Sequence, residues 1–177
     1  MKIAVYCSAK DAIPEEYLSL GDQLGTWLGK NGHALVYGGA TGGLMTHTSE
    51  AAKTAGAYVI GVIPPRITAA GRQATHCDEL IEVANMSERK QHMRDLADAI
   101  ICLPGSYGTL DEMMDATSSA IVGEHHKPTY VLNYKGFYEP LKAQIAHMQE
   151  LNFIPAQQSY EPMFVNTLEE LYTILTK

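Results

Sequence analysis

Apolar residues occur in short continuous runs that alternate with longer segments of helical periodicity. The runs predict strands, because strands covered on both faces of a sheet lose the alternation of apolar and polar residues. They cover residues 3–7, 34–38, 57–63, 99–104 and 128–133. Helical spacing predicts helices over residues 15–31, 43–55, 87–97, 109–122 and 138–150. Strand followed by helix, repeated along the chain, predicts the α/β class: a Rossmann-like, doubly wound parallel sheet with helices on both faces.

Glycine and proline mark the boundaries between these elements. Asn31 and Gly32 end the first predicted helix, and Gly56 ends the second. A Pro-Pro pair stops the third strand and opens residues 64–79, the least regular stretch, which we expect to be a mobile or partner-facing loop. No repeat or linker interrupts the chain, so residues 1–177 are expected to form a single domain.

Composition narrows the possible partners. The chain carries 13 Lys and Arg against 20 Asp and Glu, a formal charge of -7, which leaves no basic face for nucleic acid or an anionic membrane. Cys7, Cys77 and Cys102 are odd in number and lack disulfide spacing, which favours a reducing cytoplasm. The first apolar run is too short for a signal peptide or a membrane span. We therefore expect a cytoplasmic protein.

Two glycine-rich turns follow predicted strands and precede predicted helices. In the first, VYGGATGGLM, glycines at 38, 39, 42 and 43 surround Thr41, and such a turn lets the backbone approach a phosphate at the start of a helix. Its spacing matches neither a dinucleotide fingerprint nor a Walker loop. Tight packing of the turn is the alternative explanation. In the second turn, LPGSYGTLDEM, the hydroxyls of Ser106 and Thr109 can bond a ligand or cap the helix.

One carboxylate and one guanidinium interrupt apolar helix faces. Glu112 lies off the apolar stripe near the start of its helix, so it faces the crevice or solvent, although acids are common in first turns. Arg89 shares a face with Met86 and Met93, and if buried it needs a carboxylate or phosphate partner; the alternative is that its head reaches water. The neighbouring Lys90 and Arg94 are interpreted from the pattern alone as surface charges.

The helix of Arg89 directly precedes the strand that leads into the second turn, so Arg89 and Glu112 can reach one crevice. A carboxylate, a guanidinium and two turns suited to phosphate suggest a phosphorylated sugar as ligand. The seven histidines show no metal-ligand spacing, so neither a metal nor a cofactor is expected.

These residues resemble the LOG family of cytokinin riboside 5'-monophosphate phosphoribohydrolases, often labelled lysine decarboxylases. The family motif PGGxGTxxE is similar to residues 104–112, GGGxxGLM is similar to residues 38–45, and its RK pair is similar to Arg89-Lys90. Ala40 and Ser106 stand where the family motifs have glycine. The segments GVIPP, ADAIICLP and KPTYVLN are similar as well, so the resemblance extends to about Pro155.

The resemblance implies a homodimeric hydrolase that cleaves the N-glycosidic bond of AMP or an N6-modified relative, with Glu112 and Arg89 as the catalytic pair. An ionised carboxylate would stabilise the positive charge that forms on the sugar. The residues expected to bind the substrate are Ser8, Gly38, Gly39, Thr41, Gly42, Gly43, Met86, Lys90, Gly105, Ser106, Tyr107, Gly108 and Thr109. A non-catalytic nucleotide or cofactor carrier on the same fold is the main alternative.

Overall fold

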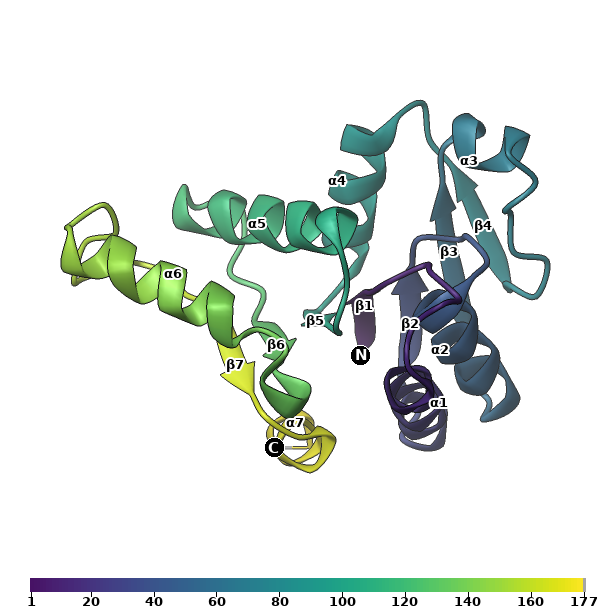
Figure 1. Ribbon diagram of the computed structural model, residues 1–177. Coiled ribbons are helices and arrows are strands. Elements are labelled where there is room, and N and C mark those ends of the chain that lie inside the picture. Colours follow the sequence, from purple (N-terminus) through teal and green to yellow (C-terminus); the bar gives the residue numbers. More distant parts are fainter. Residues whose placement is uncertain (177) are drawn as a thin grey trace.

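The computed structural model describes residues 1–176, which form one seven-stranded parallel sheet (Figure 1). The strand order is β4-β3-β2-β1-β5-β6-β7, and each neighbouring pair is parallel. The strands are β1 (Lys2–Tyr6), β2 (Ala34–Tyr37), β3 (Val59–Ile63), β4 (Glu79–Glu82), β5 (Ala99–Cys102), β6 (Thr129–Leu132) and β7 (Met163–Val165). The predicted doubly wound α/β fold is confirmed.

Helices cover both faces of this sheet (Figure 1). Within residues 1–176 they are α1 (Glu15–Lys30), α2 (Gly43–Thr54), α3 (Pro65–Ala69), α4 (Met86–Leu96), α5 (Tyr107–Ile121), α6 (Glu139–Glu150) and α7 (Leu168–Leu175), with a 3-10 turn at Tyr134–Gly136. Helices α1, α2 and α7 pack on one face, and α4 and α5 pack on the other, beside α6. None of the helices in this part of the chain is long and apolar enough to cross a membrane.

The central strands explain the continuous apolar runs. Ile3 and Val5 of β1 point into the core beneath α1 and α2, whereas Ala4 and Tyr6 point into the core beneath α4 and α5. All four side chains are at most 1% exposed. Because each face of the strand is covered, neither face carries polar residues, and period-two alternation is absent.

The structure adds elements that the sequence analysis did not predict. Within residues 64–79, expected to be irregular, residues 65–69 form α3, and β4 begins at Glu79, so that expectation is wrong at both ends of the stretch. Strands β4 and β7 lie at the two edges of the sheet, and β7 and α7 follow the last predicted helix. Edge strands are short and partly exposed, so their apolar signal is weak: β4 has an exposed Glu at each end.

Helices α1 and α2 approach closely because α1 presents Gly21, Gly25 and Gly29 to α2. A Cβ atom at Gly25 would lie 2.3 Å from the Thr48 carbonyl oxygen and 2.8 Å from the Ala52 nitrogen. Both atoms belong to the backbone of α2, which cannot move aside as a flexible side chain can. Any side chain at position 25 must therefore push the two helices apart.

We expect Gly25→Val to lower the free energy of unfolding by about 1–3 kcal/mol, the usual cost of overpacking. Urea unfolding followed by circular dichroism measures this change. Gln23→Val is the matched control, because Gln23 is exposed on the same helix and the substitution adds the same β-branched residue. Equal losses in the two variants would show that helix propensity, not the contact with α2, sets the cost.

Candidate active site

The candidate site lies where the strand order reverses. Strands β1 and β5 are neighbours, but the chain continues from β1 toward β2 on one side and from β5 toward β6 on the other. In open parallel sheets, the loops after two such strands diverge and leave a crevice at their carboxyl ends. Here those loops are residues 7–14, which lead into α1, and residues 103–106, which lead into α5.

A buried ion pair joins α4 to α5 beside this crevice. The Nη1 atom of Arg89 lies 2.6 Å from Oε1 of Glu112, and the two side chains are 3% and 4% exposed. The Nε atom of Arg89 donates to the Val62 carbonyl oxygen of β3 at 3.1 Å. A buried guanidinium needs a carboxylate or phosphate partner, and Glu112 is that partner of Arg89.

The start of α4 fixes the position of Arg89. The Asn85 side chain accepts a hydrogen bond from the Glu88 backbone N–H at 3.0 Å, and the Glu88 carboxylate accepts one from the Ala84 N–H at 2.9 Å. The Asn85 side chain thus caps the helix by satisfying an N–H group that the first turn leaves free, and Glu88 ties the preceding residue to the helix. Arg89 follows one turn later and points toward the sheet.

The electrostatics of the pair are set by its burial. Burial raises the pKa of Glu112 above its ordinary value, and the Arg89 guanidinium opposes that rise. An arginine cannot lose its proton, so it favours the ionised carboxylate next to it. Burial also raises the pKa of Cys7, which lines the same cavity, so this thiol stays protonated at neutral pH.

The first of two adjoining cavities, here called the pair cavity, has a volume of about 180 Å³ and is lined by both members of the ion pair. It gathers seven of the residues predicted from sequence: Ser8, Met86, Arg89, Ser106, Gly108, Thr109 and Glu112. Ser106 occupies the N-cap position of α5, but its hydroxyl makes no capping hydrogen bond. That hydroxyl therefore remains available to a ligand.

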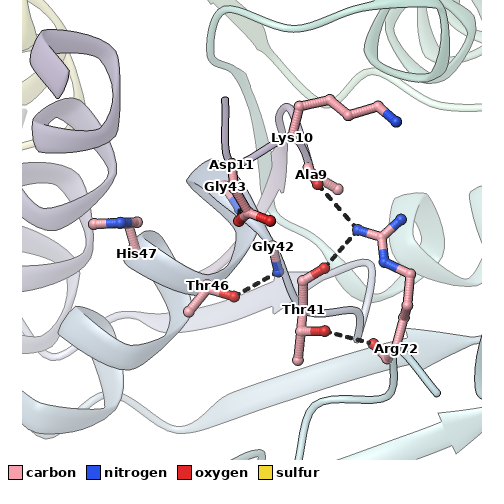
Figure 2. Close-up of a pocket in the computed structure, with 9 residues that line it drawn as sticks. All are labelled: Ala9, Lys10, Asp11, Thr41, Gly42, Gly43, Thr46, His47 and Arg72. Carbon is pink, nitrogen blue, oxygen red and sulfur yellow. Dashed lines mark hydrogen bonds between the residues drawn. The ribbon is translucent and has the colours of Figure 1, made fainter. Parts of the chain in front are cut away.

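The second cavity, here called the turn cavity, has a volume of about 440 Å³ and contains Thr41, Gly42 and Gly43 of the first glycine turn (Figure 2). The N–H groups of these residues already have protein acceptors. Thr41 donates to the Arg72 carbonyl oxygen at 2.8 Å, Gly42 to the Thr46 hydroxyl at 2.7 Å, and Gly43 to the Asp11 carboxylate at 2.7 Å. A phosphate could bind these N–H groups only by displacing those acceptors.

Three other predicted glycines lie outside both cavities and serve close packing. A Cβ at Gly38 would lie 1.6 Å from Nη2 of Arg89, and one at Gly105 would lie 2.0 Å from the Thr109 hydroxyl oxygen. A Cβ at Gly39 would lie 3.2 Å from the Val62 nitrogen. Gly38 thus makes the space that the guanidinium occupies.

The remaining predicted residues, Lys90 and Tyr107, line neither cavity. Lys90 pairs with Asp111 at 2.9 Å and with Asp115 at 3.2 Å, and Tyr107 is 90% exposed at the start of α5. The interpretation of Arg94 as a surface charge is wrong. Arg94 is 9% exposed and forms an ion pair with Asp115, because α5 packs over this face of α4.

Two cationic residues that were not predicted from sequence, Lys10 and Arg72, line both cavities. Arg72 belongs to the stretch expected to be a loop, where no periodicity marks a buried face. A bridge between Ala40 and Gln73 brings this segment against the glycine turn. Only pairing distant in sequence creates this contact, so no local pattern could have revealed it.

The space at Gly38 yields a test of the packing. We expect Gly38→Ala to lower the free energy of unfolding by about 1–3 kcal/mol, because the added methyl group overlaps the guanidinium. Chemical denaturation measures this change in the free energy of unfolding. Gly108→Ala is the control, because a Cβ atom at Gly108 would have no neighbouring atom within 4 Å. In an Arg89→Met background the cost of the added methyl group should shrink. A cost that is unchanged in that background would contradict the assigned clash.

The fold and the site define a class: a Rossmann-like α/β protein with a buried arginine–carboxylate pair at its topological switch point. The family described as "Possible lysine decarboxylase" matches residues 45–176. The chain is 33% identical over 168 residues to a cytokinin riboside 5'-monophosphate phosphoribohydrolase of Mycobacterium marinum, covering 95% of this chain and 89% of that relative. The chain belongs to this family, the LOG family.

Two further comparisons show the breadth of the similarity. The rice protein named Cytokinin riboside 5'-monophosphate phosphoribohydrolase LOG is 40% identical over 139 residues, which cover 78% of this chain but 57% of that relative. Among solved structures, the molybdenum cofactor binding protein of Rippkaea orientalis superposes with a TM-score of 0.73 at 23% identity, covering 99% of this chain and 94% of that chain. The structural match shows a shared fold.

Proposed function

We propose that this protein hydrolyses the N-glycosidic bond of an adenine-type nucleoside 5'-monophosphate, either AMP or an N6-modified cytokinin nucleotide. The products would be the free base and ribose 5-phosphate. The observation that carries the proposal is the Glu112 carboxylate, held by Arg89 at 2.6 Å and lining a cavity at the switch point. Relatives at 33–40% identity bear the name of this activity.

The geometry suits a reaction that builds positive charge on a sugar. As the bond from C1' to the base nitrogen breaks, its electron pair leaves with the base and the ribose becomes cationic. Water then adds its oxygen to C1', and its proton balances the departing base. Glu112 would stabilise the cationic ribose, because a fixed negative charge is worth more beside the transition state than beside the neutral substrate.

The two members of the pair have different tasks in this mechanism. Oε1 of Glu112 accepts a hydrogen bond from Arg89, and the other carboxylate oxygen accepts none from residues 1–176. That second oxygen can bond a ribose hydroxyl or orient the attacking water. Arg89 keeps the carboxylate ionised and in place. The mechanism requires no metal or cofactor.

The direct test is incubation of the purified protein with AMP and with isopentenylated AMP, followed by mass spectrometry. Free base and ribose 5-phosphate should appear in equal amounts. The ratio of kcat/KM for the two nucleotides would identify the preferred base. Absence of both products at saturating nucleotide would overturn the proposed hydrolase.

The second candidate is a carrier that binds a nucleotide or cofactor without turnover. It is favoured by the structural similarity to carriers of the molybdenum cofactor: one from Chlamydomonas reinhardtii superposes with a TM-score of 0.73 at 20% identity. Tight nucleotide binding by calorimetry, with no product over hours, would support the carrier. The buried pair favours the enzyme, since a carrier has no need for a negative charge beside the sugar.

The raised pKa of Glu112 leads to a predicted pH dependence. The carboxylate must be ionised to act, so protonation abolishes its contribution. Because burial raises the pKa of Glu112, kcat should fall as pH is lowered through a value above the ordinary range of a glutamate. A pH–rate profile for AMP measures this limb. A flat profile down to the ordinary glutamate range would contradict the role given to Glu112.

We further propose a cytoplasmic homodimer with a small-molecule nucleotide as its partner, and with no nucleic-acid or membrane partner. Exposed apolar side chains near the ends of α5 and α6 favour a covered surface: Val122 is 74% exposed and Phe153 is 79% exposed. Light scattering coupled to size exclusion tests the assembly. A monomeric mass at micromolar concentration would contradict the dimer.

A further inference from the structure

The loop that leads into α5, residues 103–106, is anchored at Leu103 from two sides. The Leu103 N–H donates to the Tyr6 carbonyl oxygen of β1 at 2.9 Å, and the Leu103 carbonyl oxygen accepts from the Tyr138 hydroxyl at 2.8 Å. Pro104 follows and has no N–H to donate. Leu103 is therefore the residue at which hydrogen bonds hold the start of this loop.

Several contacts fix Tyr138 beyond the end of β6. Its backbone N–H donates to Oδ1 of Asn133, the residue that follows β6, at 2.8 Å, and the Asn133 N–H donates to the Val165 carbonyl oxygen of β7 at 2.8 Å. The Phe137 ring packs edge-on against the Tyr138 ring, with 4.9 Å between the centroids. Asn133 and Tyr138 are both buried. The phenol thus reaches residues 103–106 from a fixed point on the sheet.

The Tyr138 hydroxyl is a permanent donor at neutral pH. Burial raises the pKa of Tyr138 above its ordinary value, and the nearby Gly105 N–H partly opposes that rise. The phenol therefore stays protonated and can donate to the Leu103 carbonyl oxygen. Both residues are buried, so loss of the hydroxyl would cost this carbonyl oxygen a donor in a place where an unpaired acceptor is unfavourable.

Residues 103–106 are in direct contact with the first turn of α5. A Cβ atom at Gly105 would lie 2.0 Å from the hydroxyl oxygen of Thr109, so the loop backbone and the Thr109 side chain touch. Thr109 lines the pair cavity together with Glu112, which lies in the next turn of α5. A shift of the loop therefore displaces the start of α5 and the carboxylate that the helix carries.

We propose that Tyr138 is a positioning residue for the hydrolysis, because its hydrogen bond to Leu103 holds the loop that sets Glu112 beside the ribose. The inference rests on the proposed function, since the reaction requires the carboxylate close to C1'. Tyr138 lines neither cavity, so it acts only through the loop. Displacement of a reacting group by about 1 Å can lower a rate about a hundredfold. The structural alternative is that the phenol only satisfies a buried carbonyl oxygen.

The kinetic test compares Tyr138→Phe with Tyr160→Phe, which removes a phenol at the opposite edge of the sheet. The Tyr160 hydroxyl donates to the Lys127 carbonyl oxygen at 2.8 Å, near the amino end of β6 and away from the crevice. Tyr138→Phe should lower kcat for the preferred nucleotide about 10–100-fold and change KM less than about threefold, whereas Tyr160→Phe should change neither. Equal losses in the two variants, or wild-type kcat in Tyr138→Phe, would overturn the inference.

A double variant tests whether Tyr138 acts through Glu112. In the Glu112→Gln background the carboxylate is already absent, so Tyr138→Phe should lower the residual kcat less than about twofold. A general loosening of the structure would instead lower the rate by the same factor with and without the carboxylate. A factor that is equal in the two backgrounds would therefore contradict the proposed route.

Hydrogen exchange separates this inference from the proposed function. Mass spectrometry follows the peptide that covers residues 103–112, whose amides should exchange at least about fivefold faster in Tyr138→Phe than in the wild type or in Tyr160→Phe. Unchanged exchange would refute the positioning role even if AMP is never hydrolysed. Faster exchange in Tyr138→Phe, with no turnover by the wild type, would refute only the hydrolase and would support the hold of Tyr138 on the loop.

Discussion

Glu112→Gln should lower kcat for AMP at least a hundredfold and leave KM nearly unchanged. Glutamine keeps the shape of the side chain and removes the negative charge, so the loss reports charge stabilisation of the cationic ribose. Removal of one preorganised electrostatic group from an active site typically costs about 10²–10³ in kcat. Steady-state release of the free base, followed by chromatography, measures the effect.

The neighbouring residue provides a matched control for that change. Asp111→Asn makes the same chemical substitution one position earlier on α5, where the side chain is 58% exposed and pairs with Lys90 outside both cavities. It should retain most of the activity. Turnover by Glu112→Gln at the wild-type rate would remove Glu112 from the mechanism, provided that circular dichroism shows a folded protein.

Arg89→Met should reduce the free energy of unfolding by about 3–5 kcal/mol, the usual result of removing one partner from a buried ion pair. The substitution leaves the Glu112 carboxylate 4% exposed without its cation, and the Val62 carbonyl oxygen loses a donor. The penalty should exceed that of any exposed charge removed from the same helix, such as Asp95. Urea unfolding at neutral pH provides the measurement.

A double variant separates burial of charge from loss of packing. Arg89→Met combined with Glu112→Leu replaces the pair with apolar groups, and such replacements are often neutral or stabilising. Most of the lost stability should return, while AMP hydrolysis stays absent. If the double variant is as unstable as the sum of the single variants, packing rather than an unpaired charge is responsible.

The middle of the fold could be predicted from sequence because its strands are covered on both faces. Strands such as β1 and β5 are entirely apolar in their interior, so the pattern predicts five strands and five helices in the right order. Edge strand β4 exposes two of its four residues and β7 exposes one of its three, so both have weak patterns. Their assignment depends on pairing with β3 and β6, which is information about distant contacts.

The candidate site could be predicted only where a residue broke a local pattern. Arg89 interrupts the apolar face of its helix, and Glu112 lies off the apolar face of its own helix, so the sequence marks both residues. Their 2.6 Å contact is visible only in the structure. Lys10 and Arg72 break no pattern. The roles of the glycines could not be predicted from sequence either, because composition does not distinguish a turn that binds phosphate from one that makes room for a neighbouring side chain.

The absence of a side chain at Gly38, whose place the Arg89 guanidinium takes, has a consequence for how this site can change. Since an added methyl carbon would fall 1.6 Å from the guanidinium, the effects of substitutions at positions 38 and 89 are coupled. A side chain at position 38 would displace that guanidinium and so weaken its contact with Glu112. Engineering that aims at a new chemistry on this scaffold should begin with these two positions altered together.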